Sequence, residues 1–240
     1  MTMLGQALQF IADPHNKFGQ ELLITLEMCA IPIVLSLLIA IPLGIAVAQQ
    51  PVAAFLATNT SGLARAIPTI AFLAAAIPIL GIGFRPSVLA LTLLGIPPIL
   101  LNTIAGLRGI DPATLDAGRG MGMTRRQILT GIEIPLVLPV VAAGVRSAAV
   151  QIVATSTLAA LVGGGGLGDY VVAGIALGDA GALRLFVGAV SIAVLALLVE
   201  VALAYVQRRV TPMGLRSGAE LAAPHAAPEP ALVEAGTRAA

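Results

Sequence analysis

Long apolar runs constrain this chain more than any other feature. Five of them cover residues 22–48, 52–82, 87–107, 136–161 and 183–206. A helix needs about 20 mainly apolar residues to cross a bilayer, and each run is close to or above that length. Charged residues make up only 10% of the 240 positions, against about 25% in a typical soluble domain. The sequence therefore predicts an all-α integral membrane protein with about five transmembrane helices.

The two flanking segments differ from this membrane core, which we place at residues 21–210. In residues 1–20, Lys17 follows the first apolar residues and no small-residue cleavage site is visible, so we expect a retained, external N-terminal segment rather than a signal peptide. Residues 211–240 are rich in Ala, Pro and Glu and lack hydrophobic periodicity. They predict a disordered cytoplasmic tail.

Several functional classes are disfavoured by residues that the sequence lacks. A phosphate-binding loop needs the pattern G-x-x-x-x-G-K-[ST], and the single lysine, Lys17, has no such context. The single cysteine, Cys29, excludes an intramolecular disulfide and a C-x-x-C metal site. A net charge of +1 without a basic stripe does not indicate nucleic-acid binding. We expect a chain that is not itself an enzyme and holds neither a metal nor a cofactor.

The distribution of arginine predicts the orientation in the membrane, because cytoplasmic loops carry an excess of Lys and Arg. If the polar segment 111–135 lies in the cytoplasm, Lys17, Arg85 and Arg184 face outward and Arg65 falls near the inner side. The arginines placed inside are then Arg108, Arg119, Arg125, Arg126, Arg208, Arg209 and Arg216. The N-terminus is therefore expected outside and the C-terminus inside.

Segment 111–135 is a polar island between two apolar runs. Asp111-Pro112 is typical of a helix N-cap followed by the first helical position. Thr124 can cap a second helix over 125–132, and Pro135 is expected to restart the chain at the membrane. A tight bend between the two helices is predicted by Gly118, Gly120 and Gly122. Such a knob can dock a partner, lie on the membrane surface or serve as a simple connector.

The same island resembles the EAA loop of ABC importer membrane subunits, whose pattern is E-A-A-x3-G-x9-I-x-L-P. The spacing fits without a gap, with Asp for Glu, Gly for the second Ala and Ile for Leu. The matching positions are Asp116, Ala117, Gly118, Gly122, Ile132, Ile134 and Pro135. The resemblance implies that this loop couples the chain to a separate ABC ATPase subunit, which binds ATP and Mg. It also implies a type I importer (MetI-like) permease fold and a second permease copy or paralogue.

A second resemblance concerns the cargo. Residues 157–170, together with 143–146, are similar to permeases of osmoprotectant uptake, which handle glycine betaine, choline or carnitine. This implies an extracytoplasmic binding protein that delivers the substrate to a bacterial cell membrane. Aromatic residues are only 3% of the chain, too few for a tight cage around a quaternary ammonium. A methionine-type amino-acid importer is the nearest alternative, and an ATP-independent secondary carrier or a structural scaffold are alternatives of other classes.

Polar residues inside the predicted spans are candidates for the substrate pathway. Arg146 falls near the middle of the run 136–161, where a charge usually faces the bundle interior or a cavity. It can pair with Glu27 or Glu200, contact the second permease copy, or line the path. The other candidates are Asn102, Thr155 and Thr157. Hydrogen bonding within or between helices is their alternative role.

Overall fold

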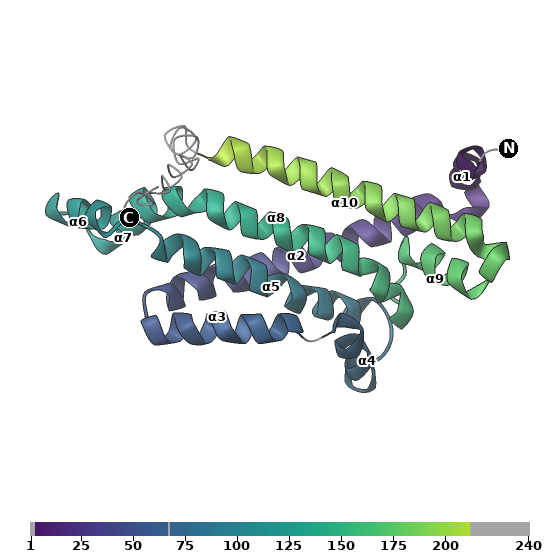
Figure 1. The fold of residues 1–240 in the computed structure, drawn as a ribbon, viewed down its shortest axis with the longest axis horizontal. Coiled ribbons are helices and arrows are strands. Elements are labelled where there is room, and N and C mark those ends of the chain that lie inside the picture. The colour runs from purple at the N-terminus through teal and green to yellow at the C-terminus, as the bar shows by residue number, and fades with distance from the viewer. Residues whose placement is uncertain (1–2, 67, 212–240) are drawn as a thin grey trace, which may run out of the picture.

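The apolar runs fold as long helices, because a helix satisfies its own backbone hydrogen bonds without water. The computed structural model describes residues 3–66 and 68–211, and every regular element in these ranges is helical. The longer helices lie side by side in an elongated bundle (Figure 1). The α-helices are α1 (Met3–Ala12), α2 (Phe18–Ala48), α3 (Pro51–Ala66), α4 (Thr69–Leu80), α5 (Phe84–Arg108), α6 (Pro112–Gly120), α7 (Arg125–Ile128), α8 (Ile134–Ala159), α9 (Gly168–Ala176) and α10 (Ala182–Val210).

Four segments of the described chain are long and apolar enough to cross a membrane. They are Pro14–Ala48, Phe84–Arg108, Arg125–Val162 and Gly178–Val210. The predicted span over 52–82 is instead divided between α3 and α4. The break falls at Pro68, which has an extended backbone (φ −60°, ψ 127°) and lacks the N–H that would continue a helix. Together α3 and α4 return the chain between α2 and α5 (Figure 1), so the arrangement is consistent with about five passes.

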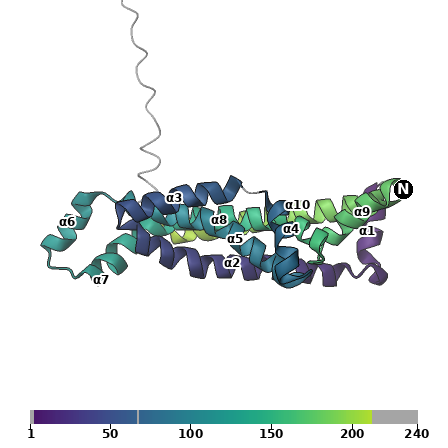
Figure 2. The same ribbon diagram turned by 90° about the horizontal axis from the view of Figure 1, so that it is seen from below.

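The two ends of the bundle carry different structures. α6 and α7 project beyond one end, whereas α1 and α9 lie at the other (Figures 1 and 2). α10 starts beside α9 and runs toward the end that carries α6 and α7. The described chain therefore begins and finishes at opposite ends of the bundle.

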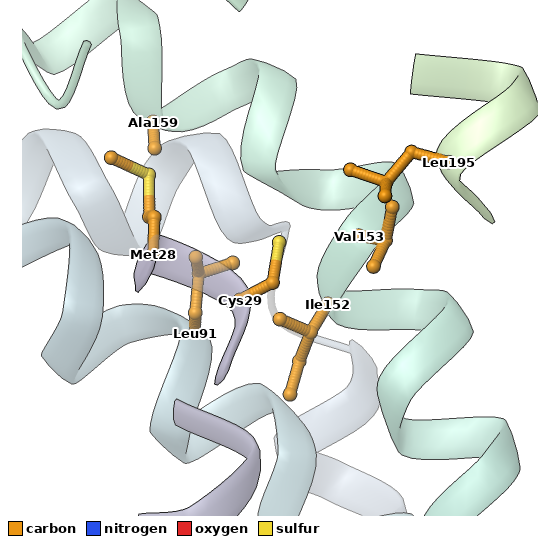
Figure 3. Packing of buried hydrophobic residues seen from close by; sticks show 7 residues of the cluster. All are labelled: Met28, Cys29, Leu91, Ile152, Val153, Ala159 and Leu195. Atoms are coloured by element: carbon orange, nitrogen blue, oxygen red, sulfur yellow. The ribbon is translucent and has the colours of Figure 1, made fainter. Parts of the chain in front are cut away.

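The core forms where α2, α5 and α8 meet, with a contribution from α10. Figure 3 shows its main cluster, which consists of Met28, Cys29, Leu91, Ile152, Val153, Ala159 and Leu195. Cys29 is a free cysteine buried in this cluster. Small residues let the helices approach closely: a Cβ on Gly95 of α5 would lie 2.5 Å from Ser36 Oγ of α2. Ser36 Oγ also donates a hydrogen bond of 2.8 Å to the Thr92 carbonyl across the same contact.

The predicted domain limits can be placed on these elements. α1 and a 3-10 turn, Pro14–Asn16, occupy most of the expected N-terminal segment 1–20, and α2 begins at Phe18. α10 ends at Val210, where the predicted membrane domain ends. The predicted disordered tail, 211–240, lies outside the described residues except for Thr211.

Candidate functional site

The polar segment 111–135 forms a knob at one end of the bundle (Figure 2). α6 begins as the sequence predicts. The Asp111 carboxylate accepts a hydrogen bond from the Ala113 N–H at 2.9 Å, and Pro112 occupies the first turn, where no N–H partner is needed. α6 continues to Gly120.

The second half of the knob is continuous with a membrane span. Thr124 and Gln127 form a capping box: Thr124 Oγ1 accepts from the Gln127 N–H at 3.4 Å, and Gln127 Oε1 accepts from the Thr124 N–H at 2.8 Å. After α7 the chain passes through a π-helical turn, Leu129–Glu133, directly into α8. Pro135 lies in the first turn of α8, and the chain reaches it without a break in helical winding. The wide turn precedes Pro135, whose ring and missing N–H disturb ordinary helical bonding.

The glycines of the knob have different roles, and the predicted three-glycine bend is only partly right. Gly122 makes the turn, since its φ of +78° favours a residue without a Cβ. Gly120 ends α6 with open space around it. Gly118 is buried inside α6, and a Cβ there would lie 2.9 Å from Ile132 Cδ1. α6 thus packs against the helix that leads into the membrane. The contact is made by Gly118 and Ile132, two positions of the EAA-loop pattern, and by buried Ile128.

Other positions of the pattern face outward. Asp116 and Ala117 are exposed, and Asp116 Oδ1 pairs with Arg119 Nη1 at 2.6 Å. Such an exposed pair contributes little to stability, so Asp116 can exchange Arg119 for a partner's cation at small cost. Met121 is also strongly exposed, and Ile134 is exposed beside half-buried Pro135. The knob therefore presents charged and apolar side chains on two helical segments that pack against each other.

The opposite end of the bundle is fastened by a glycine-rich loop. Glu21 Oε2 accepts a hydrogen bond from the Gly166 N–H at 2.8 Å, and Thr25 Oγ1 accepts one from the Leu167 N–H at 2.7 Å. Gly166 has φ +88°, and a Cβ there would lie 2.5 Å from Thr25 Oγ1. The loop therefore requires glycine for both its backbone conformation and its close approach to α2.

α9 follows this loop and carries two groups with shifted pKa values. Burial, with a smaller effect from the charge on Glu21, raises the pKa of the Asp169 carboxyl. Burial also raises the pKa of Tyr170. The Tyr170 hydroxyl donates to the Asn16 carbonyl, and its ring packs between Phe10 and Phe18. These contacts join α9 to the N-terminal segment.

Arg146 lies in a groove between α8 and α10. Its Nε forms an ion pair with Glu200 Oε1 at 2.8 Å, and its Nη1 donates to Gln207 Oε1 at 3.3 Å. Of the two pairing partners predicted for Arg146, the structure selects Glu200. The groove has a volume of about 690 Å³ and is lined by Ala143, Arg146, Ser147, Val150, Gln151, Ala154, Glu200 and Gln207.

The other three pathway candidates do not line this groove. Asn102 Nδ2 donates to the Pro98 carbonyl of its own helix at 2.8 Å, so that bond lies within α5 rather than across helices. Thr155 is half-buried on α8. Thr157 lies near the far end of α8, where its carbonyl would be 3.0 Å from a Cβ on Gly168. The structure thus separates these residues from Arg146.

Sequence reasoning missed three polar residues of the groove. Ser147 and Gln151 are spaced i, i+4 on α8, and Gln207 lies seven residues after Glu200 on α10. Both spacings place their residues on one face of a helix. This periodicity of polar residues inside an apolar span was visible in the sequence and is the signal that could have identified them.

The fold and these sites define a polytopic helical membrane protein with a polar knob at one end and a polar groove along its bundle. A family model described as the binding-protein-dependent transport system inner membrane component matches residues 40–212. The chain belongs to this family.

Curated relatives cover nearly all of the chain. The glycine betaine/carnitine/choline transport system permease protein OpuCB of Bacillus subtilis is 36% identical over 205 residues, which are 85% of this chain and 92% of the relative. The carnitine transport permease protein OpuCB of Listeria monocytogenes is 37% identical over 88% of this chain and 95% of its own. The choline transport system permease protein OpuBB of Bacillus subtilis is 35% identical over 89% of this chain and 98% of the relative.

A solved structure shares the fold. A chain of the MetNI methionine ABC transporter in an inward-facing conformation matches with a TM-score of 0.70 and 25% identity, over 81% of this chain and 96% of that chain. The match supports the MetI-like permease fold that the loop resemblance implies.

Proposed function

We propose that this chain is the membrane-spanning permease subunit of an ABC importer for osmoprotectants such as glycine betaine, choline or carnitine. One observation carries the proposal: relatives named for glycine betaine, carnitine and choline transport align over at least 85% of the chain. The structural neighbour from a methionine transporter is less similar in sequence, at 25% identity, and makes methionine the competing cargo. The substrate reaches the outer end on an extracytoplasmic binding protein.

The knob 111–135 is the proposed contact with an ABC ATPase subunit, which binds ATP and Mg. The exposed Asp116, Ala117 and Met121 supply the contact surface, while Gly118 and Ile132 keep α6 against the stem of α8. Because α7 continues into α8, a displacement of the knob by the ATPase is passed to a membrane span. A second permease copy or paralogue completes the pore.

We infer the orientation in the membrane from where the arginines gather. The end of the bundle that carries the knob also receives the end of α10 with Arg208 and Arg209 (Figure 1). Lys17 and Arg184 belong to the opposite end. An excess of arginine marks the cytoplasmic side, so the N-terminus lies outside a bacterial cell membrane and the last helix ends in the cytoplasm. Arg146, Asn102, Thr155 and Thr157 remain the proposed residues of the substrate path.

Competition for uptake tests the cargo. Cells that contain the whole complex are given radiolabelled glycine betaine, choline, carnitine and methionine in separate assays, each with the other three unlabelled compounds as competitors. We expect uptake of at least one of the three osmolytes, and neither uptake of methionine nor competition by it. Uptake of methionine alone, or osmolyte uptake that persists without the ATPase subunit, contradicts the proposal.

A further inference from the structure

The groove between α8 and α10 is a polar surface inside the membrane-spanning part of the chain. Arg146 and Glu200 keep 39% and 34% of their side-chain surface exposed, and Ser147 is exposed beside them. A charged side chain facing hydrocarbon is strongly unfavourable. This groove therefore faces water or protein in the assembled transporter, unlike the apolar face of α10 around Leu198, which suits lipid.

The Arg146–Glu200 pair keeps the empty groove neutral. Arg146 Nε lies 2.8 Å from Glu200 Oε1, and Gln207 links the pair to the start of α8, since its Nε2 donates to the Pro139 carbonyl at 3.1 Å. A lone charge at this depth would be costly, whereas a mutually compensated pair is not. A ligand that compensates both members of the pair must therefore supply one charge of each sign, whereas a lone cation compensates Glu200 only.

We propose that this groove is a two-point transit site for small zwitterions, with Arg146 holding the carboxylate and Glu200 the quaternary ammonium. The proposal rests on the osmoprotectant function and names the chemistry by which the chain itself contacts its cargo. A guanidinium binds a carboxylate through paired N–H donors. A quaternary ammonium has no N–H group, so the Glu200 carboxylate holds it by charge alone.

The site is suited to passage rather than tight binding. Its volume of about 690 Å³ exceeds that of a small osmolyte. None of the described residues that line the groove is aromatic, so these residues offer no aromatic cage for a quaternary ammonium. Conduction requires a site that is favourable enough to enter and weak enough to leave, and an internal ion pair that reforms after the zwitterion departs provides that balance.

Substrate selectivity separates this site from an ion pair that only fastens α10 to α8. Glycine betaine carries both charges, whereas choline lacks the carboxylate. We expect Arg146→Gln to lower betaine uptake at least ten-fold relative to choline. Glu200→Gln should shift the ratio the other way, because Glu200 is the single charged contact for choline. Equal losses of both substrates in both variants indicate a structural pair and overturn the proposal.

Cysteine accessibility tests the groove independently of transport. In a Cys29→Ala background, Ser147→Cys and Gln151→Cys are treated in membrane vesicles of the whole complex with a charged methanethiosulfonate reagent. We expect both to react, and millimolar glycine betaine to slow the reaction several-fold. Leu198→Cys, on the opposite face of α10, is the matched control and should not react, because a thiol in lipid stays protonated.

The two proposals fail in different ways. If wild-type complex imports neither osmolyte while Ser147→Cys reacts and is protected by glycine betaine, the groove stands and the proposed cargo function fails. If import is normal but neither groove cysteine reacts, or glycine betaine does not protect either one, the transit site is wrong and the permease function stands.

Discussion

Replacing Thr25 by valine should loosen the contact that fastens the glycine-rich loop to α2. Thr25 is 2% exposed. Its Oγ1 accepts from the Leu167 N–H at 2.7 Å and donates to the Glu21 carbonyl at 2.8 Å. Valine keeps the shape but removes both bonds. The buried Leu167 N–H then loses its partner, which costs about 1–3 kcal/mol.

The expected loss can be measured by thermal unfolding of the purified complex. For a chain of this length, 1 kcal/mol shifts the midpoint by about 2–4 °C, so Thr25→Val should lower it by roughly 2–12 °C. Amide hydrogen exchange at Leu167 should become faster. Thr25→Ser, which keeps the hydroxyl, should retain most of the stability.

Thr103→Val is the matched control. Thr103 is equally buried, at 1%, but its hydroxyl donates only to the Ile99 carbonyl of its own helix, at 2.7 Å. Valine there leaves no N–H without a partner, so the midpoint should fall less. A Thr25→Val midpoint within 1 °C of wild type, or a Thr103→Val loss of the same size, refutes the reasoning.

Two further perturbations address the knob and α9. Gly118→Leu should push α6 away from Ile132, whose Cδ1 would lie 2.9 Å from the new Cβ, and should lower several-fold the amount of ATPase subunit that co-purifies. Gly118→Ala should be tolerated, because the tip of the Ile132 side chain can shift. Equal recovery of the ATPase subunit with both variants contradicts this packing role. Burial and the charge on Glu21 raise the pKa of Asp169, so the folded protein favours the protonated acid. Ionised Asp169 therefore destabilises the fold, and this loss of stability grows as the pH rises above about 3.8, the ordinary pKa of the group. Asp169→Asn should therefore raise the melting midpoint at pH 7, with the gain shrinking toward pH 4; a gain that is independent of pH rules out this origin.

The spans and caps could be predicted from the sequence because they depend on local chemistry. Apolar length predicts a membrane helix wherever it occurs, and the caps at Asp111 and Thr124 need only residues two or three positions away. The run 52–82 shows the limit of this local reasoning. A proline at position 68 divides it into two helices, and apolar composition alone did not reveal that break.

The relations between distant residues could not be predicted in the same way. Glu21 and Gly166 are separated by 145 positions and meet only because α2 and the loop before α9 share one end of the bundle. The role of Gly118 as a packing position likewise depends on Ile132, fourteen residues later. Arg146 was assigned two possible partners, and only the packing of α10 on α8 selects Glu200.

The central claim is that the knob couples this permease to ATP hydrolysis on another chain, and ATP-driven uptake in proteoliposomes tests it most directly. Gly122 turns the knob with φ +78°, a conformation that strains any residue with a Cβ, so Gly122→Arg distorts the turn and the docking surface together, without a steric clash inside the chain. Wild-type complex should accumulate glycine betaine only with ATP on the ATPase side, and Gly122→Arg should lose both the co-purified ATPase and uptake. Full uptake and normal ATPase recovery in Gly122→Arg, or accumulation without the ATPase, would contradict the account.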